Sequence, residues 1–153
     1  MTIDFAIEKS EYISGIRIIT PSVYDESRGS IWTSYNSSQI GTLLPDGMIF
    51  KHDKFSSSKN NVLRGIHGDR KSWKLVSCVY GEIQQVVVDL RKDSSTFLKH
   101  ESFNLGNNDH RMVLIPPGLG NAFYVKSETA TYHYKLAYDG DYADTDEQFT
   151  VAW

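Results

Sequence analysis

The sequence has 153 residues, enough to bury a hydrophobic core, so we expect a single domain over residues 1–153. Its 16 basic and 19 acidic side chains leave a net charge of -3, too balanced to indicate nucleic acid or an anionic membrane as the main partner. Nowhere does it approach the ~20 consecutive apolar residues of a membrane span, and residues 1–10 lack an export signal, which predicts a cytoplasmic protein.

Strand-forming residues recur along the chain, often alternating apolar with polar side chains. The predicted strand regions are, in order, residues 15–24, 48–56, 73–91, 99–106, 111–125 and 129–140. Within the third region, Cys78 is the single cysteine, which excludes an internal disulfide, and its apolar neighbours predict a buried thiol. A helix is conceivable only over residues 30–41, where Trp32, Tyr35 and Ile40 are loosely spaced.

Turn-forming residues separate these strands and predict an all-β sandwich or barrel of the jelly-roll type. Gly81 lies between two strand-like runs, where a tight hairpin would need it, and Pro116-Pro117-Gly118 precedes another strand. In a small antiparallel barrel, alternate residues of each strand face the interior. The polar or aromatic side chains expected to line one shared cavity are His67, Lys74, Gln85, Tyr132 and Tyr134, with Asn121 at its mouth.

Four segments, in the same order, resemble the dTDP-4-dehydrorhamnose 3,5-epimerase family, which consists of cupin-type jelly rolls acting on nucleotide-linked 4-keto sugars. They are DESRGSIW (25–32), NNVLRGIHGD (60–69), KLVSCVYGEIQQVVVDLRKDSSTF (74–97) and RMVLIPPGLGNAFYVKSETATYHYK (111–135). The stretches GNAFYV and YHYK are more similar to shorter members that act on GDP-linked 4-keto-6-deoxy heptoses in capsule synthesis. The resemblance implies a nucleotide-diphosphate sugar as the substrate.

The resemblance also implies the roles of individual residues. An epimerase must remove a proton beside a ketone on one face and return one on the other face. By the family's pattern His67 is the base and Tyr134 the acid, and histidine suits the first role because its ordinary pKa of ~6.5 lies near working pH. Lys74 matches a lysine beside the keto oxygen, where a cation stabilises developing negative charge. Arg28 and Arg64 match arginines that hold the diphosphate.

The sequence departs from the family's pattern in three places. Many members carry a histidine where this chain has Asn121 and an aspartate where it has Gln85; an asparagine can orient the substrate but cannot titrate. The C-terminal extension that can supply a carboxylate partner for the base does not follow EQFTVAW (147–153). The sequence leaves open whether Asp89 or Asp144 orients His67 instead, whether His67 works alone at lower basicity, or whether the C-terminus is naturally short.

A cupin also raises the question of a metal. Metal-binding cupins carry two histidines one residue apart, then a glutamate and a later histidine. Here IHGD (66–69) has one histidine with Asp69 nearby, so we predict no metal, and we predict no other cofactor because no glycine-rich phosphate loop is present. The remaining histidines, expected to be superficial or structural, are His52, His100, His110 and His133, the last facing outward beside Tyr134.

Three functions follow as hypotheses. The first is an epimerase that inverts C3, or C3 and C5, of a nucleotide-linked 4-keto-6-deoxy hexose or heptose. The second is a 3,4-ketoisomerase, and the third is a cupin that binds a sugar nucleotide without catalysis. The apolar segment IRII (16–19) and the family's habit predict a homodimer in which an N-terminal segment completes the neighbour's site.

Overall fold

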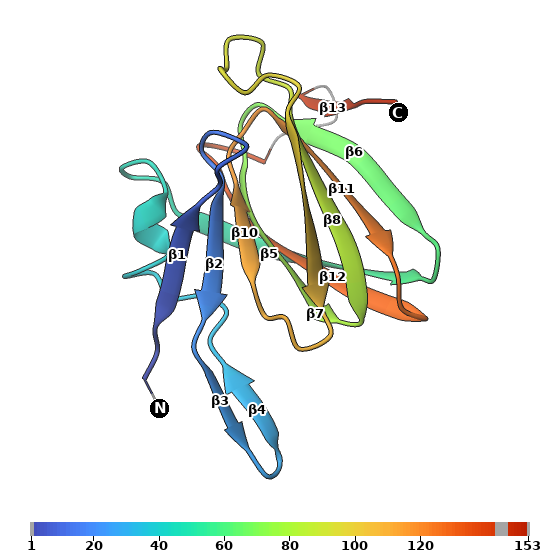
Figure 1. Cartoon of the computed structure of the whole chain (residues 1–153). Coiled ribbons are helices and arrows are strands. Elements are labelled where there is room, and N and C mark those ends of the chain that lie inside the picture. The colour runs from blue at the N-terminus through green and yellow to red at the C-terminus, as the bar shows by residue number, and fades with distance from the viewer. Residues whose placement is uncertain (1, 143–146, 153) are drawn as a thin grey trace.

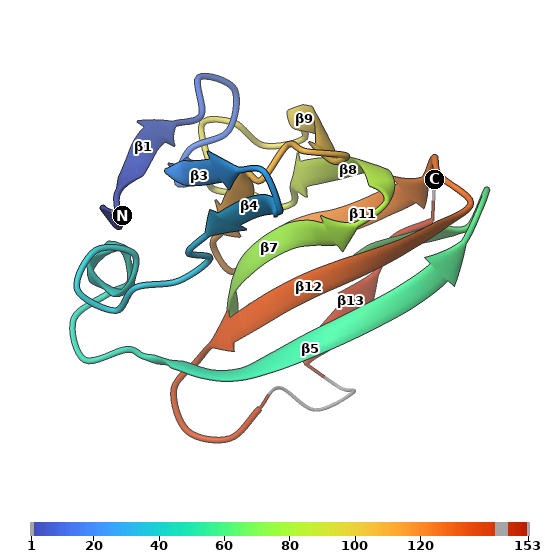
Figure 2. The same cartoon turned by 90° about the horizontal axis from the view of Figure 1, so that it is seen from below.

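Two antiparallel sheets, packed face to face, form the body of the molecule in the computed structural model, which describes residues 2–142 and 147–152 (Figures 1 and 2). The six-stranded sheet has the order β1 (Phe5–Lys9), β2 (Arg17–Pro21), β10 (Met112–Ile115), β7 (Trp73–Tyr80), β12 (Thr129–Ala137) and β5 (Phe50–Lys59). The five-stranded sheet has the order β13 (Gln148–Thr150), β6 (Leu63–Asp69), β11 (Leu119–Val125), β8 (Glu82–Asp89) and β9 (His100–Gly106). The predicted all-β jelly-roll sandwich is confirmed.

The core lies between the sheets because apolar residues alternate with polar ones along each strand. Val76, Ile83, Leu105, Val113 and Val125 are completely buried there. Cys78 belongs to the same core, as predicted, and burial raises the pKa of its thiol to about 11. The described residues contain no helix that is both long enough and apolar enough to cross a membrane.

A second apolar cluster covers the outer face of the six-stranded sheet and explains why residues 30–41, the one helix candidate, do not form a helix. Ile40 is completely buried in this cluster together with Leu75 and Leu114, so the segment is used as a cover for the sheet. The carbonyl of Asn36 accepts from the N–H of Ile40, as in one turn of an α-helix, and its side chain accepts from the N–H of Ser38, but no regular helix continues from this turn. Only a short 3₁₀ turn, η1 (Gly41–Leu43), follows.

The expected hairpin at Gly81 is also wrong, although the tight turn is present. β7 and β8 on either side of Gly81 belong to different sheets, so the turn leads from one layer of the sandwich to the other. Gly81 has a φ of +76°, and a Cβ atom there would lie 2.1 Å from the carbonyl oxygen of Thr129. A glycine is therefore required for the close passage of two backbones.

The N-terminal region contributes a hairpin that the sequence did not predict. β3 (Val23–Glu26) and β4 (Gly29–Trp32) pair only with each other among the described strands, and they extend beyond the end of β2, away from the two sheets (Figure 1). The short strands β1 and β13 were not predicted either, and β6 also lies outside the predicted strand regions. By contrast, Ile16 and Ile19 of the apolar IRII segment are fully buried inside this chain, so they are not available to a second copy.

Candidate active site

One cavity between the sheets brings together most of the residues singled out from the sequence. It has a volume of about 620 Å³, and its lining includes His67, Tyr134, Lys74, Arg64, Asn121 and Tyr132. His67 lies on β6 and Asn121 on β11 in one sheet, while Lys74 lies on β7 and both tyrosines lie on β12 in the other. The two candidate proton-transfer groups, His67 and Tyr134, therefore reach the cavity from opposite sheets.

The imidazole of His67 is held by the last strand of the chain. In the antiparallel register Thr150 on β13 lies opposite His67, and Asn121 on β11 lies opposite it on the other side. The Nδ1 atom of His67 is 3.0 Å from the Oγ1 atom of Thr150. If this hydroxyl accepts from Nδ1–H, the neutral ring carries its free lone pair on Nε2, which is the form that a base requires.

Sequence reasoning missed Thr150 because β13 was not predicted. Its only signal is the polar-apolar-polar order of Gln148, Phe149 and Thr150, which is too short to identify a strand without its partner. It also missed Lys54, Ser56 and Tyr142, which line the same cavity. The alternation along β5 places Lys54 and Ser56 on the opposite face of the strand from Phe55, and this pattern was visible in the sequence.

A conformational requirement of glycine keeps Arg64 and His67 beside the cavity. Gly65 has a φ of +139°, and a Cβ atom on it would lie 2.3 Å from the Cβ atom of Ala122 on the neighbouring strand. The β6–β11 register shifts at this point, between Asn121 and Phe123. Glycine thus allows β6 to pass close to β11, while the Nε atom of Arg64 donates a 2.8 Å hydrogen bond to Ser58.

Lys74 brings a fixed positive charge to the cavity wall. Its Nζ atom lies 3.4 Å from the Oδ2 atom of Asp69, and the lysine side chain is only 15% exposed. The Oδ1 atom of the same carboxylate accepts hydrogen bonds from the backbone N–H groups of Lys71 and Ser72. Asp69 therefore anchors the turn before β7 and holds the ammonium group of Lys74.

Gln85 lies behind the cavity wall rather than in it. Its side chain is completely buried, and its Nε2 group donates to the Oδ1 atom of Asn121. The Nδ2 group of Asn121 in turn donates a 3.0 Å hydrogen bond to the hydroxyl oxygen of Tyr132. Burial raises the pKa of Tyr132 far above the ordinary range of a phenol, so this hydroxyl keeps its proton.

Within one chain, Arg28 does not line the cavity with the other predicted site residues. It lies at the tip of the β3–β4 hairpin, where its side chain is 81% exposed and its guanidinium is 2.6 Å from the carboxylate of Glu26. Arg28 is absent from the described lining of the cavity. The guanidinium therefore points into solvent from a segment that extends away from its own sheets.

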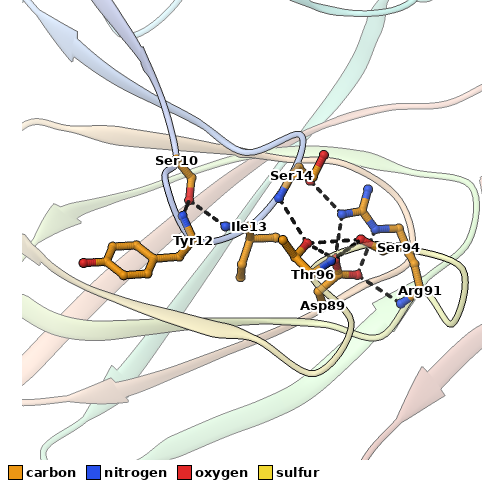
Figure 3. Close-up of polar contacts among 8 residues, drawn as sticks. All are labelled: Ser10, Tyr12, Ile13, Ser14, Asp89, Arg91, Ser94 and Thr96. Atoms are coloured by element: carbon orange, nitrogen blue, oxygen red, sulfur yellow. Dashed lines mark hydrogen bonds and ion pairs between the residues drawn. The ribbon is translucent and has the colours of Figure 1, made fainter.

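Asp89 does not orient His67. Its carboxylate accepts hydrogen bonds from Arg91, Ser94 and Thr96, and Arg91 also donates to the carbonyl oxygen of Ser14 (Figure 3). Asp89 thus ties the segment after β8 to the turn before β2. Asp144, the other acid considered, lies outside the described residues.

The remaining histidines are not among the described residues that line this cavity, and three of them contact aromatic or acidic side chains. His133, whose side chain is 10% exposed, is 2.7 Å from the carboxylate of Asp53; His52 contacts Tyr138; and His110 stacks on Trp32. Within residues 2–142 and 147–152, no three His, Cys, Asp or Glu side chains are arranged as metal ligands.

Comparisons with known proteins point in a single direction. A family model described as dTDP-4-dehydrorhamnose 3,5-epimerase matches residues 10–153. The enzyme of that name from Salmonella typhimurium is 35% identical over 144 residues, which cover 92% of this chain and 77% of the relative. The enzyme of the same name from Escherichia coli is 31% identical, with 92% and 76% covered.

The solved structures agree with the sequence comparisons. A dTDP-6-deoxy-D-glucose-3,5-epimerase from Legionella pneumophila, in complex with dTDP-4-keto-L-rhamnose, superposes with a TM-score of 0.87 at 32% identity. The superposition covers 98% of this chain and 79% of the Legionella chain. The similarity therefore extends over both sheets and the cavity between them.

Proposed function

This chain belongs to the dTDP-4-dehydrorhamnose 3,5-epimerase family, and we propose that it inverts C3, or both C3 and C5, of a nucleotide-linked 4-keto-6-deoxy sugar. It is accordingly an enzyme of the isomerase class. The observation that carries the proposal is the position of His67 and Tyr134, which line one cavity from opposite sheets with Lys74 beside them. A sugar ring bound between the sheets would present one face to each group.

The proposed chemistry uses only groups of this chain. His67 takes the proton from the carbon next to the ketone and becomes an imidazolium, and the electron pair moves into the enolate. The ammonium of Lys74 stabilises the negative charge that develops on the enolate oxygen. Tyr134 then gives its hydroxyl proton to the opposite face of the carbon, which inverts the centre. Exchange with water restores the proton of the phenol and neutralises the imidazole.

Arginines supply the proposed contacts with the diphosphate. Arg64 lies at the cavity, and within the described residues its guanidinium has one hydrogen bond, from Nε to Ser58. Its NH groups can therefore form a bidentate contact with a phosphate. Asn121 contributes a polar wall next to the sugar, and Gln85 holds the side chain of Asn121 from behind that wall. Arg28 is the second phosphate ligand, and it requires a second copy of the chain.

We propose a homodimer in which the β3–β4 hairpin of one protomer completes the cavity of the other. The hairpin exposes the apolar side chains of Tyr24 and Ile31, which are paired across the two strands and so share one face, and that of Val23 on the other face. The hairpin has no other strand partner in the described residues. Burying these side chains against a second copy would favour association. The same contact would carry Arg28 from solvent toward a nucleotide diphosphate.

The nucleobase and the sugar are tested directly. The family points to a dTDP-linked 4-keto-6-deoxy hexose, while the stretches GNAFYV and YHYK support a GDP-linked 4-keto-6-deoxy heptose of capsule synthesis as a second candidate. The protein is incubated with each sugar in deuterium oxide and the products are followed by NMR and mass spectrometry. Deuterium at C3 or C5 with inversion supports the epimerase. A relocated carbonyl would identify a ketoisomerase, and binding without exchange would identify a non-catalytic protein.

A further inference from the structure

We propose that Gln85 and Asn121 form a one-way chain of hydrogen bonds that holds the hydroxyl of Tyr132 as a donor to the sugar in the cavity. Gln85 and Asn121 are then positioning residues, and Tyr132 is a sugar-binding residue. The proposal rests on the proposed function, since it assigns a further contact to the same site.

The chain starts from a glutamine that has no contact with solvent. The side chain of Gln85 is completely buried, and its Oε1 atom has no hydrogen-bond partner among the described residues. Its Nε2 group, in contrast, lies 3.4 Å from the carbonyl oxygen of Val86 and donates to the Oδ1 atom of Asn121. The donor end of this amide is therefore the end that the fold uses.

The direction of donation is passed from one side chain to the next. Because the Oδ1 atom of Asn121 accepts from Gln85, its Nδ2 group is the end that faces Tyr132, and it donates to the hydroxyl oxygen at 3.0 Å. A hydroxyl that accepts such a bond retains its own proton for a further acceptor. The alternative hydrogen bond, from the Tyr132 hydroxyl to the Oδ1 atom of Asn121, is longer at 3.4 Å.

The last member of the chain faces the place where a sugar would bind. Tyr132 is 2% exposed and packs in the core, but it also lines the deep end of the cavity that His67 and Tyr134 line, and its ring centroid lies 5.7 Å from that of Tyr134. It also stacks on Phe123, with ring centroids 4.3 Å apart, which fixes the plane of the ring. A hydroxyl or keto oxygen of the sugar that reached this depth would complete the chain as the final acceptor.

The chain contains two carboxamides and a phenol, so none of its members gains or loses a proton near neutral pH. The direction of the chain is thus set by the buried glutamine and not by a charge. Removal of the donor of Gln85 would allow the amide of Asn121 to turn over. The hydroxyl of Tyr132 would then donate to Asn121 and could no longer donate to the sugar.

The test compares the binding of nucleoside diphosphates with that of their sugar conjugates. Isothermal titration calorimetry gives Kd for dTDP and dTDP-glucose and for GDP and GDP-mannose, and the pair that binds more tightly is used. The ratio of the two Kd values measures the sugar's contribution. Gln85→Met removes the donor at similar volume, Tyr132→Phe removes the hydroxyl, and Ile83→Val is a control for a small core change on the same strand.

We expect Gln85→Met and Tyr132→Phe each to lower the sugar's contribution by about tenfold, the loss of one hydrogen bond, while Kd for the diphosphate alone is unchanged. The double variant should be no weaker than Tyr132→Phe, because Gln85 acts through the phenol. Ile83→Val should match the wild type.

A sugar contribution within twofold of the wild type in Gln85→Met would overturn the proposal, as would additive losses in the double variant or a wild type that binds the conjugate no better than the diphosphate. Deuterium exchange by the wild type, measured in parallel, separates this result from the proposed function. If the wild type exchanges deuterium and Gln85→Met leaves the sugar's contribution unchanged, the proposed chain of hydrogen bonds is rejected and the proposed epimerase function is retained. If the variants show the expected binding pattern but the wild type exchanges no deuterium, the proposed chain of hydrogen bonds is retained and the proposed epimerase function is rejected.

Discussion

Among the described residues, a single hydroxyl forms a hydrogen bond with the imidazole of His67 and orients it. Its Nδ1 atom contacts Thr150 at 3.0 Å, and the two residues are separated by 83 positions in the sequence. Thr150→Val keeps the shape of the side chain and removes the acceptor, so the imidazole loses the contact that selects its tautomer. We expect the rate of deuterium exchange at the sugar to fall about tenfold, a typical effect of misplacing a general base.

Thr150→Ser is the matched control because it retains the hydroxyl. It should keep most of the wild-type rate in the same NMR assay, and thermal unfolding of both variants should stay close to that of the wild type. An equal loss of rate in the serine and valine variants would show that the hydroxyl is not what orients His67.

The residues that the sequence located correctly and those that it did not locate differ in a physical way. Lys74, Asn121 and Tyr134 lie on strands within the predicted regions, so the side of the sheet that they face could be inferred. His67 lies on β6, outside those regions, and the family's motif identified it. Thr150 could not be found because its strand has three residues and is defined only by pairing with β6. Arg28 carried a recognisable motif, but the direction of its hairpin depends on contacts beyond the local sequence.

At the scale of elements, Asp89 holds the segment between β8 and β9 in place. Burial by itself would raise the pKa of its carboxyl, but hydrogen bonds from Arg91, Ser94 and Thr96 outweigh burial and hold the pKa well below its usual range. Asp89→Asn breaks a buried ion pair, and we expect it to lower the free energy of unfolding by about 3 kcal/mol at pH 7. Urea denaturation followed by tryptophan fluorescence measures this change.

The pH dependence of this loss has a definite sign. Because the pKa of Asp89 is lower in the folded than in the unfolded protein, the carboxylate's stabilisation is complete above the ordinary aspartate pKa of ~3.9 and declines as the pH falls below it. The difference between the wild type and Asp89→Asn should therefore shrink below about pH 4. A difference that stayed constant between pH 7 and pH 3 would contradict this account.

The chain offers a matched control for this prediction. Asp109 and Arg111 repeat the same two-residue spacing, with an Arg111 N–H donating to the carboxylate at 3.0 Å, as in Asp89 and Arg91. Asp109 is 31% exposed, whereas Asp89 is completely buried. Asp109→Asn should lower the free energy of unfolding by less than about 1 kcal/mol, since exposed ion pairs contribute little.

The elements themselves were predictable to the extent that local pattern decides them. The long strands follow from alternation and β-propensity, and so does the sandwich. The assignment of β7 and β8 to different sheets does not, because a tight turn at Gly81 is compatible with both a hairpin and a passage between layers. The one helix candidate, residues 30–41, does not form a helix, and Ile40 there packs against Leu75 and Leu114.

At the scale of the whole molecule, the proposed exchange of hairpins makes each site depend on two protomers. Arg28→Ala should weaken binding of the nucleotide sugar about tenfold through the loss of a phosphate contact. His67→Asn should remove catalysis but leave binding intact. A heterodimer of the two variants contains one site with both His67 and Arg28, contributed by different chains.

Mixing the inactive His67→Asn homodimer with the weakened Arg28→Ala homodimer therefore tests the exchange. After subunits have equilibrated, half of the dimers are mixed and each has one intact site, so activity should recover to about a quarter of the wild-type value at limiting substrate. Analytical ultracentrifugation confirms the dimer in the same samples. If the protein is a dimer but the mixed sample recovers no activity, Arg28 does not act in the neighbour's site. If the protein is a monomer, the proposed homodimer is rejected.

The central claim is that His67 and Tyr134 act on opposite faces of the sugar, and deuterium incorporation with product configuration, measured together by NMR in deuterium oxide, tests it most directly. His67→Asn should abolish both exchange and inversion. Tyr134→Phe should still exchange the hydrogen next to the ketone, because His67 returns a solvent-derived deuteron to the face from which it took the proton, but the configuration should be retained. Exchange at the wild-type rate without His67, or normal inversion without the phenol of Tyr134, would contradict the account.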